Sequence, residues 1–491
     1  MSENLKSKVV KGAFWNGLER FGTAFFLFVS NLVLARLLSP DDFGCIGMLM
    51  VFISISDAIV DGGFGAALVQ KKNVTQEDYS TIFVWNILVS IFLYVLLFLC
   101  APIIARFYNI ESLSLILRVQ GLVLLFNGFC IIQRSMLQKN LMFKKLAKVN
   151  VSATIIGTSL GIICAFIGLG VWSLVIKLLF TSVMASVVLW MGTNWKPKIM
   201  FDYNSFKSLF SFGSFMFLTS ITNSIYQNTI SLVIGKSISS ATLGYFTQAR
   251  KLEDVPRQVL SSTVKNVSFP AFAMLQNDNK KLVVAVRKTT QLLSFVNFST
   301  SILFVLIAHP FILLLFSTKW EPSIIYFQII CIAGLIMSIS ELNITILKSI
   351  GKSRLLFLTG LMRKSLGIAL IIGGSYWGIK GILLGYVLSQ ILSYFIITYP
   401  LKVSIGYGIK RQLLDMIPCL IVAAISGMAT YYISIFFLSE LIIQQVLINA
   451  FKLSCLTVCY IMILFVISSI FNIQGAVLLK DVMYKKVFHK I

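Results

Sequence analysis

The chain has 491 residues, of which 57% are hydrophobic and only 12% charged, and its mean hydropathy is +0.89. This composition excludes an ordinary soluble domain and predicts a chain that resides in lipid. The net charge of +24 is typical of nucleic-acid-binding proteins, but in a membrane chain most of it belongs to cytoplasmic loops that face anionic headgroups.

Long apolar runs, each near the roughly 20 residues needed to cross the hydrocarbon, predict an all-α polytopic membrane protein of about 14 transmembrane helices. The longest connections are expected near 133–148, 192–205 and 276–288, too short for a soluble domain. In chain order the predicted spans cover roughly 13–38, 43–69, 80–101, 112–132, 146–167, 169–191, 206–235, 241–275, 289–316, 322–347, 355–375, 377–400, 413–438 and 446–471.

Lys and Arg concentrate in alternate connections. With the N-terminus in the cytoplasm, the inner segments hold 27 of these residues, whereas the outer loops hold four, namely Arg106, Lys236, Lys319 and Lys380. Loop Lys and Arg resist translocation, so this bias predicts that both termini are cytoplasmic. Eleven basic residues remain, and they fall inside the spans.

Little in the chain indicates enzyme chemistry. His309 and His489 are the only histidines, and all eight cysteines fall in apolar runs, so neither a metal cofactor nor a disulfide framework is predicted. A membrane-embedded glycan polymerase or ligase is the rival class, but such enzymes generally need a sizeable outer loop. We therefore expect a transporter, not an enzyme.

Two halves of the sequence share features in the same order. A shift of 200 residues aligns Ser39, Phe43 and Gly44 with Ser239, Leu243 and Gly244. Repeated halves are frequent in secondary transporters, which place the substrate site where the halves meet. We expect two pseudo-symmetric six-helix lobes, 1–200 and 201–405, followed by two additional helices and a cytoplasmic tail, 406–491. The polar stretch TNWKPKIMFDYNS between the lobes is predicted to be a hinge or a cytoplasmic crossing.

Ionisable residues inside spans are costly unless they face water or a partner. Arg250, Glu253, Asp254 and Arg257 follow helical spacing and share one face, and Asp57 and Asp61 do the same before a glycine-rich segment. Local neutralisation within these helices is the structural alternative. Cations outnumber acids inside the spans, which favours a polar cavity for an anionic ligand such as phosphate or pyrophosphate.

Several segments resemble the polysaccharide flippases of the multidrug/oligosaccharidyl-lipid/polysaccharide exporter superfamily. The similar segments are GAFWNGLERFGTAFFLFVSNLVLARLLSPDDFG (12–44), IVDGGFGAALVQKK (59–72), QRSMLQKNLMFKKLA (133–147), LGYFTQARKLEDVPRQVLSS (243–262) and FPAFAMLQND (269–278). The resemblance implies a transporter that moves an undecaprenyl-diphosphate-linked oligosaccharide, the repeat unit of O-antigen, capsule or exopolysaccharide, from the inner to the outer leaflet by alternating access.

The resemblance also implies a basic cavity for the diphosphate and sugars. Its candidate lining residues here are Arg20, Arg118, Lys177, Arg250, Arg257, Arg363 and Lys364. Candidates for ion coupling or gating, with Na⁺ or H⁺, are Asp57, Asp61 and Glu19. An internal salt bridge is the alternative for each acid.

The implied setting is a bacterial cytoplasmic (inner) membrane. Expected partners are the lipid-linked oligosaccharide, membrane lipids and the polysaccharide polymerase and export machinery. The protein itself is expected to be monomeric and to bind no nucleic acid. Other exporters of the superfamily, a peptidoglycan-precursor flippase or a multidrug exporter, are the remaining alternatives. Multidrug exporters usually carry cations, which intramembrane Arg and Lys repel.

Overall fold

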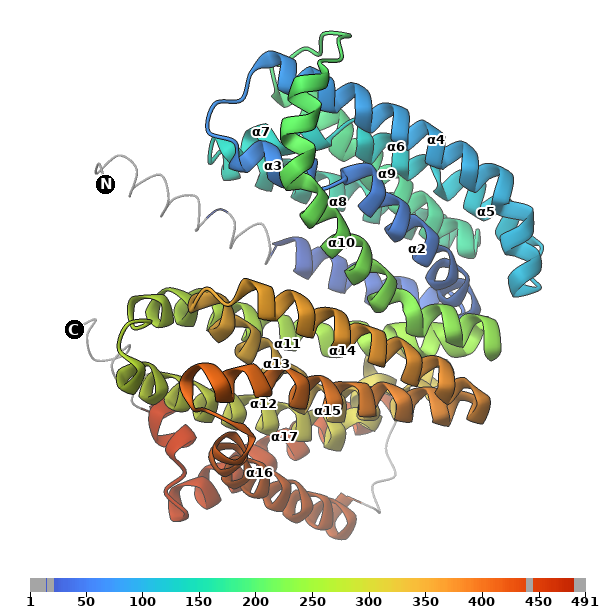
Figure 1. Ribbon diagram of the computed structural model, residues 1–491. Helices are drawn as coiled ribbons and strands as arrows, with labels where there is room; N and C mark the ends of the chain where they lie inside the picture. The colour runs from blue at the N-terminus through green and yellow to red at the C-terminus, as the bar shows by residue number, and fades with distance from the viewer. Residues whose placement is uncertain (1–14, 16–21, 439–444, 481–491) are drawn as a thin grey trace. The chain divides into compact units, whose positions relative to one another are not determined.

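The structure is a computed structural model that describes Trp15, residues 22–438 and residues 445–480. The chain forms two compact units, one ending at Gly244 and the other beginning at Tyr245 (Figure 1). These are units of close contact, and the predicted lobes 1–200 and 201–405 stay predictions.

The first unit is built of helices. A helix over Gly22–Leu37 is followed by α2 (Pro40–Asp61), α3 (Phe64–Gln70), α4 (Gln76–Tyr108), α5 (Ser112–Gln120), α6 (Leu122–Gly128), α7 (Ile131–Lys139), α8 (Phe143–Phe166), α9 (Val171–Gly192), α10 (Tyr203–Ser237) and the start of α11 (Ser240–Met274).

The second unit continues α11 and is helical in the same way. It contains α12 (Asn279–Phe316), η1 (Thr318–Trp320), α13 (Ser323–Ser349), α14 (Ser353–Gly374), η2 (Ser375–Trp377), α15 (Gly378–Ile405), α16 (Ile409–Leu438) and α17 (Gln445–Ile470).

The helices suit a bilayer. Among the described residues, ten stretches are long and apolar enough to cross a membrane. One of them, Ser353–Ile405, contains both α14 and α15, whereas the more polar α10 and α11 are not among the ten. On α4, Phe92, Leu99 and Ile103 lie on one exposed face, as lipid contact requires. The all-α polytopic architecture is confirmed, while the count of 14 crossings stays a prediction.

Local sequence explains where several helices begin. Ser39 caps α2 by accepting a hydrogen bond from the N–H of Asp42, whose carboxylate accepts one from the N–H of Ser39. Asp278 caps α12, and its hydrogen bond from the N–H of Lys281, together with the Lys281 side chain, holds the pKa of Asp278 below its usual range. The cap places Asp278 at the first turn of α12.

The predicted span 43–69 contains a break. Gly62 and Gly63 have φ values of 54° and 73°, so the chain leaves α2 through two left-handed residues and re-enters helix at Phe64. A Cβ at Gly63 would lie 2.3 Å from the backbone oxygen of Gly213 on α10. Only glycine fits this conformation and this close approach, which brings α10 against the break.

Helix α10 packs along α2, and the two ribbons lie side by side in Figure 1. The amide of Asn228 on α10 donates to the hydroxyl of Ser54 on α2 at 2.8 Å. Nearer the other end, a Cβ at Gly235 would lie 2.9 Å from Cγ of Met48. Asn228 of α10 therefore takes part in packing against α2.

Two of the three connections expected to be long are mostly helical, so that expectation was wrong. α7 covers residues 131–139 and α12 begins at residue 279. Apolar residues such as Ile132 and Leu137 are buried on α7 while Gln138 is exposed, so an amphipathic helix forms despite its charges.

The third connection, 193–202, has no helix but is held against α4. The indole of Trp195 donates to the Gln76 side-chain oxygen at 2.7 Å, and the Gln76 amide donates to the carbonyl of Lys196 at 2.8 Å. Farther along, the N–H of Asp202 donates to the hydroxyl of Thr81 at 3.0 Å. These bonds fix the predicted hinge segment to the first unit.

The C-terminal helices are integral to the second unit. Met416, Cys419 and Ala423 of α16 belong to the same buried cluster as Phe295 and Phe298 of α12. Within that unit the additional helix pair therefore shares a core with the helices before it.

Candidate functional site

Lys177 of α9, in the first unit, is half-buried. Its Nζ donates to the hydroxyl of Ser30 at 3.0 Å. The stem of Lys177 packs against α8 at Gly161, where an added Cβ would lie 2.6 Å from Cβ of Lys177. The absence of a side chain on α8 at this point allows the two helices to approach closely.

Arg118 of α5 is held by α4. Its Nε donates to the backbone oxygen of Phe98 at 3.4 Å, and its guanidinium carbon lies 4.5 Å from the centre of the Phe98 ring. A cation over an aromatic face is stabilised electrostatically. The residue is half-buried, and its known contacts are with a carbonyl and a ring.

Asp57 is held by an amide. The Nδ2 atom of Asn127 on α6 lies 3.1 Å from both Asp57 carboxylate oxygens. Asp61 lies one turn later, at the helix break, and its Oδ1 would be 2.9 Å from a Cβ at Gly65. The two acids thus sit where α2 ends. Glu19 and Arg20 lie outside the described residues.

In the second unit, α11 carries a network of ion pairs. Nε of Arg257 lies 3.1 Å from Glu253, and its Nη2 contacts Asp254. Asp254 also lies 3.8 Å from Nε of Arg250. Arg250 and Arg257 are therefore paired with acids of their own helix, as the structural alternative proposed.

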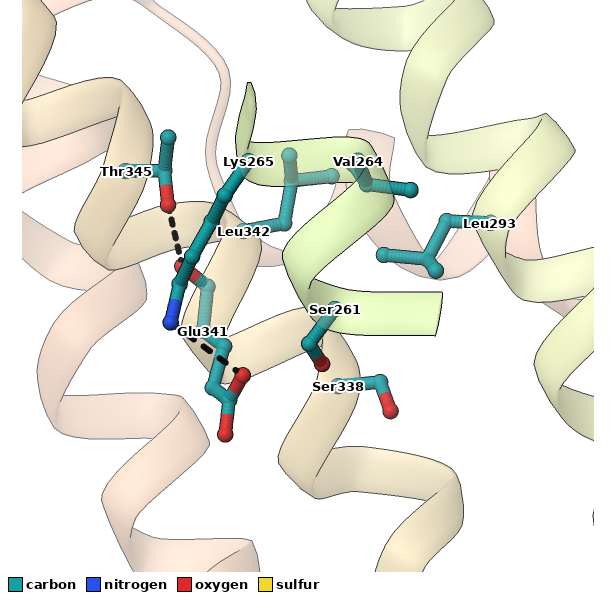
Figure 2. A pocket seen from close by; sticks show the side chains of 8 residues that line it. All are labelled: Ser261, Val264, Lys265, Leu293, Ser338, Glu341, Leu342 and Thr345. Atoms are coloured by element: carbon teal, nitrogen blue, oxygen red, sulfur yellow. Dashed lines mark hydrogen bonds and ion pairs between the residues drawn. The ribbon is translucent and has the colours of Figure 1, made fainter. Parts of the chain in front are cut away.

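The network extends to α13. Oε1 of Glu341 lies 3.1 Å from Nη1 of Arg257, and its Oε2 lies 3.5 Å from Nζ of Lys265. Figure 2 shows Lys265 and Glu341 at a pocket that Ser261, Ser338 and Thr345 also line. One carboxylate from a second helix thus bridges two cations of α11.

Arg363 and Lys364 are adjacent on α14 and half-buried. The Nη1 atom of Arg363 donates to the hydroxyl of Ser393 on α15, and its Nε donates to the carbonyl of Thr359, both at 3.3 Å. Among the predicted lining residues of this unit, Arg250 and Arg257 are linked because both contact Asp254. Arg363 has a separate set of partners. Assignment of these residues to a substrate cavity stays a prediction.

Two further charged residues, Arg134 and Asp415, lie in buried surroundings that the sequence spacing did not predict. Arg134, predicted to lie in a cytoplasmic loop, is on α7 and has a buried Nε. Asp415 of α16 has a side chain only 2% exposed and receives a bidentate pair from Arg287, at 2.7 and 2.9 Å, together with hydrogen bonds from Gln291 and Tyr407. Arg134 and Asp415 lie within the first two turns of their helices.

The arrangement offers cations, carboxylates and hydroxyls, the groups that bind anionic and sugar-bearing ligands. No group of three or more His, Cys, Asp or Glu side chains is placed to hold a metal ion within the part of the chain that the structure describes.

Comparison with known proteins decides the family. A family model described as "Polysaccharide biosynthesis protein" matches residues 33–325, more than half of the chain. The chain belongs to this family. The assignment confirms the resemblance drawn from the N-terminal and middle segments.

Curated relatives agree with the family assignment. The lipopolysaccharide biosynthesis protein WzxC of Escherichia coli (strain K12) is 26% identical over 425 residues, 84% of this chain and 85% of the relative. The teichuronic acid biosynthesis protein TuaB of Bacillus subtilis (strain 168) is 25% identical over 72% of this chain and 74% of the relative. The succinoglycan biosynthesis transport protein ExoT of Rhizobium meliloti (strain 1021) is 24% identical over 74% of each chain.

Solved structures show the same fold. The lipid II flippase MurJ, in an inward closed conformation, matches 93% of this chain and 98% of its own with a TM-score of 0.76 at 15% identity. An inward-facing multidrug transporter of the MATE family matches 78% of this chain and 94% of its own with a TM-score of 0.62, also at 15% identity. This family member therefore has the same fold as MurJ and the MATE family transporter.

Proposed function

We propose that this protein translocates an undecaprenyl-diphosphate-linked oligosaccharide from the cytoplasmic to the outer leaflet of a bacterial inner membrane. The observation that carries the proposal is the family match over residues 33–325. It is supported by relatives named for lipopolysaccharide and succinoglycan biosynthesis, one of them a transport protein, and by the fold shared with a lipid II flippase. The protein is a transporter, not an enzyme.

The proposed ligand group is the diphosphate. Within the first unit, Nζ of Lys177 donates to the hydroxyl of Ser30, and within the second unit, Nη1 of Arg363 donates to the hydroxyl of Ser393. Phosphate oxygens form stronger, charge-assisted hydrogen bonds with ammonium and guanidinium groups than a serine hydroxyl does. We assign Arg118 and Lys364 to the same set because each lies within a predicted span.

The proposed cycle is alternating access with both termini in the cytoplasm, powered by a Na⁺ or H⁺ gradient. Asp57 and Asp61 are the proposed coupling residues in the described part of the chain, because they lie at a broken transmembrane helix. Expected associates are the polymerase and export machinery, and we propose a monomer as the working unit. A multidrug exporter is disfavoured because Lys and Arg outnumber Asp and Glu inside the predicted spans, and this surplus repels cationic drugs.

Surface polysaccharide in a strain that lacks the chromosomal gene provides the test. The wild-type protein should restore the surface polymer, whereas Lys177→Ala and Arg363→Ala should accumulate lipid-linked repeat units inside the cell at normal protein level. Lys72→Ala, at an exposed position between α3 and α4, is the matched control and should restore the polymer. Full restoration of the polymer by both Lys177→Ala and Arg363→Ala would contradict the proposed diphosphate contacts.

A further inference from the structure

The bridge made by Glu341 differs from the other contacts of Arg257. Glu253 and Asp254 come from the same helix as Arg257, four and three residues before it, so they move with it. Glu341 is the one carboxylate that reaches this network from α13 within the described residues. It can therefore separate from Arg257 and Lys265 without any change in the helix that carries them.

The part of the network around Glu341 is the most exposed. Exposure of the side chains rises from 12% at Arg257 to 28% at Glu341 and 49% at Lys265. The pocket in Figure 2 lies at this accessible end and is lined by both Lys265 and Glu341. A small ligand group that entered there would meet Lys265 and the bridging carboxylate before it met Arg257.

The same pocket contains an unused donor. The side-chain hydroxyl of Ser261 is buried, and the residue is only 6% exposed. This hydroxyl has no hydrogen-bond partner in the described structure, although it lines the pocket. A buried polar group without a partner indicates a missing water or ligand atom, because leaving it unsatisfied costs stability.

Charge in the network is balanced only while Glu341 is present. Glu253 and Asp254 offset Arg250 and Arg257, and Glu341 offsets Lys265. Displacement of Glu341 leaves one uncompensated positive charge in the network. The Arg257 guanidinium and the Lys265 ammonium, which both contact this one carboxylate, share it. Phosphate oxygens suit this pair, since both cations form charge-assisted hydrogen bonds with them.

We propose that Glu341 is a tethered substitute for the substrate's anion. In the empty protein it holds Arg257 and Lys265 together, and it gives way when a phosphate group of the diphosphate binds them, with Ser261 donating a further hydrogen bond. This inference rests on the proposed function and adds to it a residue that competes with the substrate, which sets affinity and allows release.

Binding of inorganic pyrophosphate to the purified full-length protein in phosphatidylcholine nanodiscs tests the idea. Glu341→Gln keeps the size of the side chain but removes the competing charge, so the Kd for pyrophosphate should fall about tenfold. Glu321→Gln, an equal change of net charge at an exposed position of the same unit, should leave Kd unchanged. An unchanged or raised Kd for Glu341→Gln would overturn the proposal.

Two further variants keep the test decisive if Glu341→Gln proves unstable. Lys265→Gln and Ser261→Ala each remove one proposed phosphate contact. Lys265 is half-exposed and Ser261 is small, so both variants should fold. Each change, made alone in the wild-type protein, should raise the Kd for pyrophosphate several-fold. Wild-type Kd values for both variants would also reject the site.

Phospholipid headgroups share the phosphate chemistry, and a second membrane distinguishes them. If the diphosphate is the ligand, Glu341→Gln should bind pyrophosphate more tightly in phosphatidylglycerol nanodiscs as well. Loss of the effect there would assign the site to the headgroup and overturn the proposal. Export of the oligosaccharide by the wild type is scored separately, so the proposed function can fail or hold independently of Glu341.

Discussion

Gly44 and Gly244 make reciprocal contacts at the start of two helices. A Cβ at Gly44 would lie 1.8 Å from the backbone oxygen of Ser240, and a Cβ at Gly244 would lie 2.0 Å from that of Pro40. Gly44 and Gly244 are 200 residues apart in sequence, as are Pro40 and Ser240, so α2 and the start of α11 cross through equivalent positions within the first unit. A reciprocal contact of this kind is the signature of a local two-fold relationship, as expected for repeated halves.

The first prediction concerns this crossing. Gly44→Ala should destabilise the protein by about 1–3 kcal/mol, because the backbones must separate to admit one methyl group. Gly360→Ala is the control, since no atom lies within 4 Å of its Cβ position in the middle of α14. Thermal unfolding in detergent should show a lower Tm for Gly44→Ala and an equal or higher Tm for Gly360→Ala. Equal melting of the two variants would contradict the crossing.

The second prediction concerns the anchor of α16. Asp415→Asn should cost about 2–3 kcal/mol, less than the loss of a fully buried ion pair because half of Arg287 is exposed. The comparison is Asp278→Asn, whose partner Lys281 is 75% exposed and whose loss should change stability far less. Limited proteolysis of both variants checks the result, and retained resistance of Asp415→Asn would show that α16 is held by its apolar contacts alone.

The third prediction separates positioning from charge in the first unit. Ser30→Ala removes the hydroxyl that holds Nζ of Lys177 but keeps the ammonium, so we expect transport to fall several-fold, with a higher KM and a smaller change in kcat. Lys177→Ala removes the charge and should abolish transport. If Ser30→Ala and Lys177→Ala have equal activity, the hydrogen bond has no positioning role. Initial rates over a range of substrate concentrations provide the measurement.

The fourth prediction concerns coupling. If Asp57 takes up the coupling ion, Asp57→Asn should lose the stimulation of transport by an imposed Na⁺ or H⁺ gradient and retain slow, gradient-independent exchange. Glu77→Gln, an exposed acid near the start of α4, should retain the stimulation. Retained stimulation of Asp57→Asn, or indifference of the wild-type protein to both gradients, would remove Asp57 from the mechanism.

Composition and apolar periodicity predicted the fold class correctly because lipid imposes nearly continuous helices. The same signals missed the double left-handed turn at Gly62 and the helix α7 around Arg134, since glycine pairs and amphipathic helix ends resemble loops in composition. The offset of 200 residues aligned Gly44 with Gly244, but it did not predict that the two helix starts cross in contact.

The charged residues were harder to interpret. Helical spacing placed Arg250, Glu253, Asp254 and Arg257 on one face correctly, yet it could not decide between a lining and an internal network. The bridge from Glu341 to Arg257 and Lys265 joins residues 84 and 76 positions apart on different helices. Such a contact depends on how α11 packs against α13, which no local pattern specifies.

The central claim is the movement of a lipid-linked oligosaccharide across the bilayer, and purified protein in liposomes tests it most directly. Liposomes carrying the protein and a fluorescent undecaprenyl-diphosphate oligosaccharide should expose labelled sugar from the inner leaflet to a membrane-impermeant quencher, well above the rate in protein-free liposomes. Lys177→Ala should return the rate to that baseline. A wild-type rate equal to the baseline under every imposed gradient would contradict the account.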